Sequence, residues 1–230
     1  PSPMHVVLTP VVEFEPASFS TREHPRSGRE DPAGWDRYWR ASLADAGLVD
    51  LPLFRSGSWF VAVEDLTDAH VLDALLAANG PEGWSILVGG YALSLGGSDL
   101  LPGCCGDLSN LNDWRRASEH LSAEWKMLWI GHPWTQVSAE GDLLTLLRPS
   151  EQVAPGALDV FGSVPRESLG VAIERASLVV DAFAERLRPR IAAMDPSARV
   201  ANVLEILPGG INNEPCLLYT PTRPRRQPSL

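Results

Sequence analysis

Residues 84–148 consist of short apolar segments separated by glycine pairs and polar turns, and this pattern restricts the fold more than any other feature of the chain. Glycine adopts the positive φ angles of tight turns, so each pair marks a reversal between neighbouring strands. Strands joined this closely pair in antiparallel fashion. The pattern predicts a turn at Gly96-Gly97 and strands over residues 84–88, 91–95, 99–101, 125–130, 134–138 and 143–148.

Further segments on both sides of this region complete the prediction. A valine-rich stretch at residues 5–15 predicts a strand that joins a sheet formed by later segments, and residues 58–63 predict another. Asp31-Pro32 is typical of a helix start, and Gly47 ends that helix. Its apolar face carries Trp35, Trp39 and Leu43.

Three more helices follow from local signals. Thr67 is the expected cap of one helix, and Asp107 is the expected cap of another over residues 108–120. Apolar residues recur at steps of three and four from Leu169 to Leu187, which predicts one long amphipathic helix that Pro189 kinks or ends. The fold class is therefore α+β, with a mostly antiparallel central sheet flanked by N-terminal helices and one long C-terminal amphipathic helix.

The domain organisation is simple. The chain is long enough to bury one large core, and the sequence predicts a single α+β domain over residues 1–220 with a weak sub-boundary near residues 149–165. Residues 221–230 lack a pattern that could bury them and are predicted to be a disordered basic tail. No apolar stretch is long enough to span a bilayer.

Charge is concentrated in the centre of the chain. The formal net charge is −10, and residues 65–162 contain 13 acidic but only 4 basic residues. A negative field opposes binding to nucleic acid or to an anionic membrane and favours a basic protein partner. A solvated acidic surface explains the same charge equally well. Three cysteines do not form an even-numbered disulfide framework, which favours reduced thiols and a cytoplasmic location.

Five of the eight tryptophans also lie in this centre, within residues 84–134. Tryptophan is enriched at the anchors of protein interfaces, although such clustering also occurs at the edge of a core. Trp114 and Trp134 stand beside acids and turns, where we expect half-exposed indoles. The predicted binding residues are Trp114, Trp134, Asp107, Asp113, Glu119, Glu124 and Asp99.

The Gly-Gly hairpin, the acidic Gly-Asp-Leu turn at residues 106–108 and the tryptophan-containing strand that leads into further antiparallel strands resemble the SUKH superfamily of bacterial immunity proteins. The resemblance covers about residues 50–150. It implies a protein that neutralises a secreted toxin, often a nuclease, by direct binding. Together with the acidic centre, this predicts a non-enzymatic immunity-type module that binds a basic toxin domain. The chain is longer than the usual family domain, and its Cys104-Cys105 segment does not match the family pattern.

The alternative interpretation of the sequence is an enzyme. Cys104 or Cys105 with His132, oriented by Asp107 or Asp113, would supply the residue types of a cysteine-dependent hydrolase or transferase. Cysteine, histidine and aspartate side chains can also bind zinc. Adjacent cysteines on a strand point to opposite faces, however, and the sequence has no C-x-x-C motif, which argues against a zinc site. The glycines form no phosphate-binding motif. We therefore expect no catalytic residues, no metal and no cofactor, and the oligomeric state is left open.

Overall fold

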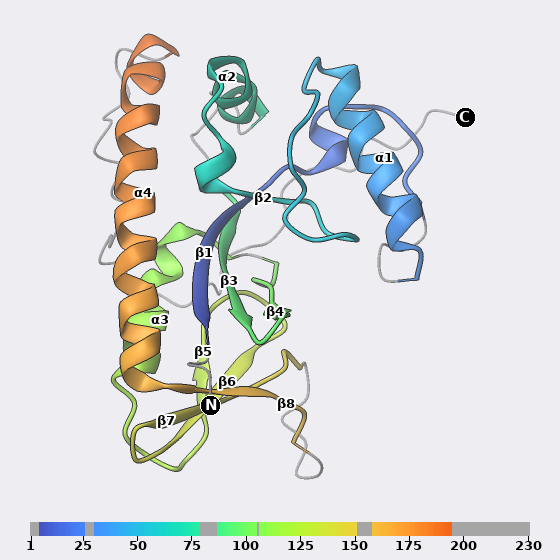
Figure 1. Cartoon of the computed structure of the whole chain (residues 1–230). Coiled ribbons are helices and arrows are strands. Elements are labelled where there is room, and N and C mark those ends of the chain that lie inside the picture. The colour runs from blue at the N-terminus through green and yellow to red at the C-terminus, as the bar shows by residue number, and fades with distance from the viewer. Residues whose placement is uncertain (1–4, 26–29, 79–86, 105, 151–157, 195–230) are drawn as a thin grey trace.

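The computed structural model describes residues 5–25, 30–78, 87–104, 106–150 and 158–194 (Figure 1). Its strands form two four-stranded sheets in which every pairing is antiparallel, and helices pack around them. The predicted α+β class is confirmed. The strands expected in one central sheet divide between two. Cys105 and the tail at residues 221–230 lie outside the described residues.

The first sheet has the order β2-β1-β3-β4. Its strands are β1 (Val6–Glu13), β2 (Phe60–Ala62), β3 (Gly89–Leu95) and β4 (Ser98–Leu100). β1 pairs with β2 on one side and with β3 on the other, so the N-terminal segment does join a sheet formed by later strands. Gly96 and Gly97, both at positive φ, form the predicted turn between β3 and β4.

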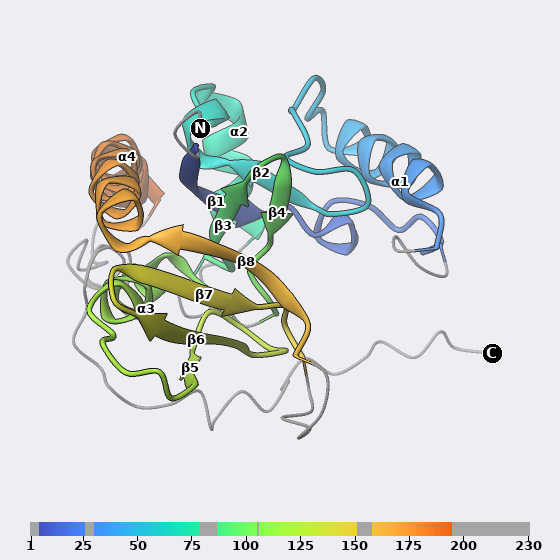
Figure 2. The same ribbon diagram turned by 60° about the horizontal axis from the view of Figure 1, so that its bottom comes forward.

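The strands of the second sheet follow chain order, β5-β6-β7-β8. In the view of Figure 2 this sheet lies toward the viewer. Its strands are β5 (Lys126–Leu128), β6 (Thr135–Glu140), β7 (Leu143–Leu147) and β8 (Val160–Pro165). β8 belongs to the segment predicted as a sub-boundary, and no strand was expected there. Gly162 and Pro165 weaken its strand pattern, and only pairing with β7 reveals it.

Capping side chains define where the two N-terminal helices begin. In α1 (Pro32–Asp45) the Asp31 carboxylate accepts a hydrogen bond from the Gly34 amide at 2.8 Å, as predicted. The cap of α2 (Ala69–Ala78) was assigned to Thr67, but the carboxylate of Asp68 accepts from the His70 and Val71 amides instead. The described residues also contain three short 3₁₀ turns: η1 (Pro16–Ser18), η2 (Val63–Asp65) and η3 (Leu108–Asn110).

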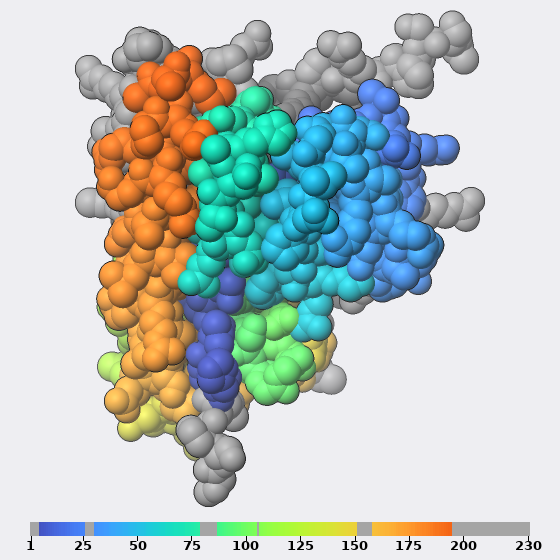
Figure 3. Space-filling view, turned by 45° about the horizontal axis from the view of Figure 1, so that its top comes forward, coloured from blue at the N-terminus to red at the C-terminus, as the bar shows by residue number. Residues whose placement is uncertain are grey.

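Two further helices pack on the sheets. α3 (Leu111–Ser118) continues directly from η3, and Asp107 caps the start of this unit as predicted. α4 (Arg166–Met194) is the long amphipathic helix, but it does not end at Pro189. Leu187 and Ile191 are both buried, so packing on either side of the proline offsets the backbone hydrogen bond that it removes. On the face shown in Figure 3, α2 lies between α4 and α1.

A single apolar cluster connects all of these elements. It contains Val12 of β1, Val137 of β6, Trp114 of α3 and Phe183 of α4, so the two sheets share a continuous buried core. α4 contacts β1, β8, α2 and α3, which places it along the whole of that core. Among the described residues, none of the helices combines the length and apolar character needed to cross a membrane.

Candidate functional site

The second sheet has an outer face that carries partly exposed side chains. Along β6, residues alternate between buried and partly exposed positions, so Val137 and Ala139 face the core while Gln136 and Ser138 face outward. Thr145 of β7 lies on the same outer side, because its register partner is Ser138. No helix among the described residues covers this face in Figure 2.

Aromatic side chains gather at the β5 end of this face. Leu128 of β5 is buried, whereas its neighbours Met127 and Trp129 are 40% and 38% exposed. Because Leu128 pairs with Thr135, Trp129 lies opposite Trp134, and the two indole centroids are 6.1 Å apart in an edge-to-face arrangement. The His132 ring packs edge-on against Trp134 at 4.9 Å. We call Met127, Trp129, His132 and Trp134 the Trp134 surface.

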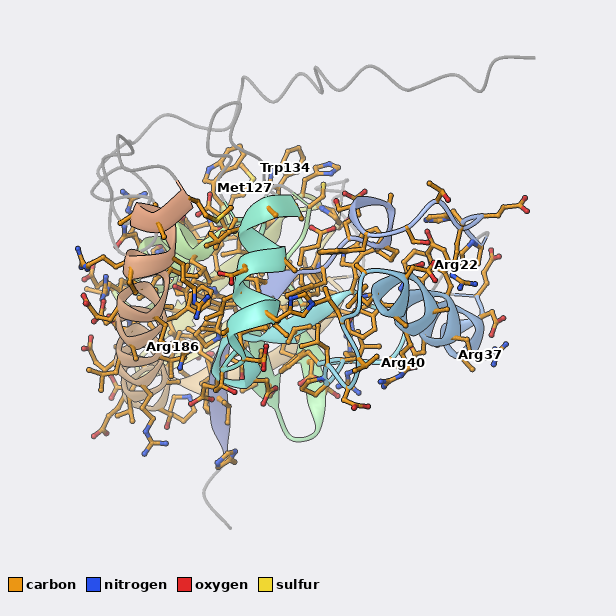
Figure 4. The ribbon with its side chains drawn as sticks, turned by 90° about the horizontal axis from the view of Figure 1, so that it is seen from above. Arg22, Arg37, Arg40, Met127, Trp134 and Arg186 are labelled. Carbon is orange, nitrogen blue, oxygen red and sulfur yellow. The ribbon has the colours of Figure 1, made fainter. Side chains whose placement is uncertain are left out.

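Figure 4 shows that Met127 and Trp134 lie on the same side of the molecule, well away from Arg37 and Arg40 of α1. The apolar residues of the Trp134 surface therefore do not mix with these exposed arginines. Aromatic and thioether groups that remain in contact with water are the side chains enriched at the centre of protein interfaces.

A thiol borders this surface. Cys104 and His132 face each other across an antiparallel bridge, with both backbone hydrogen bonds formed, at 2.9 and 2.8 Å. The exposed Cys104 Sγ lies 3.9 Å from His132 Nδ1. The sequence prediction that named Cys104 and His132 as possible chemical partners therefore matches their positions.

Trp114 does not belong to the surface. It was expected to be half-exposed, but its side chain is 0% exposed and packs in the shared core. The physical reason is its place on α3, whose buried face also carries Leu111 and Ala117. Trp134, in contrast, is half-buried as predicted.

The predicted acidic binding residues have different roles. Asp107 accepts a hydrogen bond from the Ser109 amide at 2.6 Å as the cap of η3, and burial raises the pKa of its carboxyl. Burial also raises the pKa of Asp113, which pairs with Arg116. Asp99 pairs with Arg55. These three acids already have partners within the chain and are poorly suited to anchor another protein.

Glu119 and Glu124 remain exposed and belong to the chain segment that precedes β5. They lie between α3 and β5, and the segment that contains them runs along the edge of β6, where Ser138 Oγ donates to the Ala123 carbonyl at 3.1 Å. The nearest exposed base on β5 is Lys126. Because this segment meets β6 at Ser138, the two acids lie toward the other end of β6 from Trp134.

The chemical alternative lacks a third group among the described residues. No described carboxylate bonds to His132, and Asp107 and Asp113, the two orienting residues that the sequence suggested, have the other partners given above. Within the same residues, no group of three or more histidine, cysteine or acidic side chains is arranged to hold a metal ion. Cys105 lies outside them.

Sequence reasoning missed Met127, Trp129 and Gln136. Met127 and Trp129 stand on either side of Leu128, and this period of two would have placed both on the solvent face if Leu128 had been assigned to the core. Gln136 could be found only from the β5–β6 register, which places it opposite Met127.

The fold and this surface define an α+β protein with two antiparallel sheets, one of which has an open outer face with aromatic residues at one edge. Comparisons of the chain with protein-family models, with curated proteins and with solved structures find no match. The resemblance to the SUKH superfamily therefore stays a prediction.

Proposed function

We propose that this protein is a non-enzymatic binding module of the immunity type, which neutralises a basic toxin domain in the cytoplasm by direct contact through the Trp134 surface. The observation that carries the proposal is the pair of water-accessible tryptophans, Trp129 and Trp134, in edge-to-face contact on a sheet face that no described helix covers. Such rigid aromatic residues bury a large area at low entropic cost and commonly dominate binding energy.

Charge supports a basic partner. The chain segment before β5 carries the exposed Glu119 and Glu124, and the central region of the chain is strongly acidic. An interface with an apolar centre and a charged rim gains specificity and a fast encounter from complementary charge. The same charge opposes nucleic acid as the partner.

Replacing Trp134 by alanine should weaken binding of the proposed basic toxin domain by about 30-fold, which corresponds to about 2 kcal/mol. The reason is the loss of a half-buried indole at the centre of the contact. Titration calorimetry with a catalytically inactive form of that domain measures the change. Co-expression of the active domain should then arrest growth with Trp134→Ala but not with the unmodified protein.

Leu178→Ala is the matched control, because Leu178 is also apolar, is 70% exposed and lies on α4 rather than on the second sheet. This variant should bind normally. Equal affinity of the two variants, with both still folded by circular dichroism, would remove the Trp134 surface from the interface.

Salt provides an independent test of the proposed charge complementarity. The association rate constant with the same toxin domain should fall about tenfold or more between low and high ionic strength, because exposed charges are screened. The dissociation rate constant should change much less, since it reports the apolar contacts. Stopped-flow fluorescence measures both. An association rate constant that does not change with ionic strength would argue against electrostatic steering by Glu119, Glu124 and their neighbours.

A further inference from the structure

Cys104 has no role in the binding function proposed above, although its neighbour His132 belongs to the Trp134 surface. Cys104 is exposed, and its Sγ lies 3.9 Å from the Nδ1 atom of His132, within the range of a weak sulfur hydrogen bond. A thiol becomes a strong nucleophile when an adjacent base removes its proton. This contact therefore differs from an isolated surface cysteine.

The backbone fixes the pair. A Cβ atom added to Gly103 would lie 2.5 Å from the His132 carbonyl oxygen, and one added to Gly131 would lie 2.5 Å from the Gly103 carbonyl oxygen. Gly131 also has a φ of 102°, which disfavours any other residue. The two segments approach each other this closely only because glycine precedes both Cys104 and His132.

A second contact also holds the His132 imidazole in place. Its ring packs edge-on against the Trp134 indole, with centroids 4.9 Å apart, so the Nδ1 atom is kept toward the thiol. Both partners are thus positioned by neighbouring groups before any reagent arrives. Such positioning lowers the entropic barrier of a bimolecular reaction at the thiol.

We propose that Cys104 is a covalent modification site that exchanges with low-molecular-weight disulfides, with His132 as the base. The His132 Nδ1 atom accepts the thiol proton, and the Cys104 sulfur attacks one sulfur of the disulfide. A new S–S bond forms to Cys104, the old S–S bond breaks, and the leaving thiolate takes the proton from His132 and departs as a thiol. The small disulfide is the oxidant, and it is reduced to one thiol and one protein-bound half.

The arrangement fits this reaction better than hydrolysis. Exchange at a disulfide needs an accessible thiolate and a proton acceptor, whereas acyl transfer also needs an orienting group on the histidine and donors for an oxyanion. The described residues supply the first two at Cys104 and His132 and place no carboxylate on His132. The ligand class is therefore a small disulfide such as oxidised glutathione.

The test uses the full chain with Cys105→Ser and Cys216→Ser, so that Cys104 is the only thiol. Reaction with 5,5′-dithiobis(2-nitrobenzoate) is followed by absorbance, and the adduct with oxidised glutathione is confirmed by intact mass. At neutral pH the added His132→Asn substitution should slow the reaction about threefold to tenfold, given the usual gain from an adjacent imidazole and the lower nucleophilicity of an activated thiol. His120→Asn is the matched control, because His120 is another imidazole in the same region and bonds instead to the Glu124 carbonyl at 2.9 Å.

The dependence of the rate on pH distinguishes a chemical role of His132 from an effect of its substitution on folding. The rate should rise with pH in both proteins, and the protein with His132 should have the additional reactivity near neutral pH that a proton acceptor beside the thiol supplies. This profile can be measured without any substitution at His132. Equal rates and profiles with and without His132, or a Cys104 thiol that reacts only after unfolding in urea, would overturn the proposal.

Discussion

Replacing Trp114 by alanine should lower the free energy of unfolding by about 3–5 kcal/mol. The indole is fully buried between α3 and the core that both sheets share, so its removal leaves a cavity that the surrounding strands and helices cannot close. Urea denaturation followed by circular dichroism measures the change. Trp114→Phe should cost much less, because the Nε1 atom of Trp114 is buried without a hydrogen-bond partner among the described residues and phenylalanine removes that polar group.

Trp134→Ala is the matched comparison for stability. Its side chain is half-buried on the outer face, so truncation should lower the free energy of unfolding by clearly less than Trp114→Ala. This contrast separates a core tryptophan from a surface tryptophan in one assay. Equal losses from the two substitutions would show that the outer face is packed more tightly than its exposure indicates.

Glu13→Gln should stabilise the protein at pH 8 and have almost no effect near pH 4. Burial at the end of β1, with a smaller contribution from the negative charge of Glu15, raises the pKa of Glu13 from about 4.5 to about 7. The folded state therefore holds this proton more tightly than the unfolded state. Stability falls as pH rises from about 4.5 to 7, and the full cost remains above that range.

The size of this effect follows from the pKa difference. A shift from about 4.5 to about 7 is worth at most about 3 kcal/mol, and the solvent contact that Glu13 retains reduces the expected gain to about 1–2 kcal/mol at pH 8. Urea denaturation at pH 4, 6 and 8 measures it. Glu30→Gln, at an exposed acid before α1, is the control and should leave the pH dependence unchanged. A gain from Glu13→Gln that is the same at every pH would contradict the titration argument.

Local signals in the sequence were sufficient for several elements. The α1 helix follows from Asp31, Pro32 and the spacing of Trp35 and Trp39, because a cap and an apolar stripe are both readable within a few residues. The β3–β4 hairpin follows in the same way from Gly96-Gly97. Each of these elements depends on interactions between residues that are close in the chain.

The features that depend on distant residues were not readable. β8 becomes a strand through its pairing with β7, and Trp114 becomes a core residue through the packing of α3 on α4. Both depend on contacts across many residues of chain, which no local pattern specifies. The contact between Cys104 and His132 could be named from residue type, but its distance depends on a bridge between segments 28 residues apart.

The position of α4 in the chain has a consequence for synthesis. This helix covers β1 and α3 and contacts β8, yet it follows every described strand in sequence. A growing chain emerges from the ribosome N-terminus first, so both sheets are made before their common cover exists. The apolar residues that face α4 must therefore stay in contact with water or with a chaperone until residues 166–194 have emerged. Final packing of the two sheets on each other is then a late event, completed by one helix.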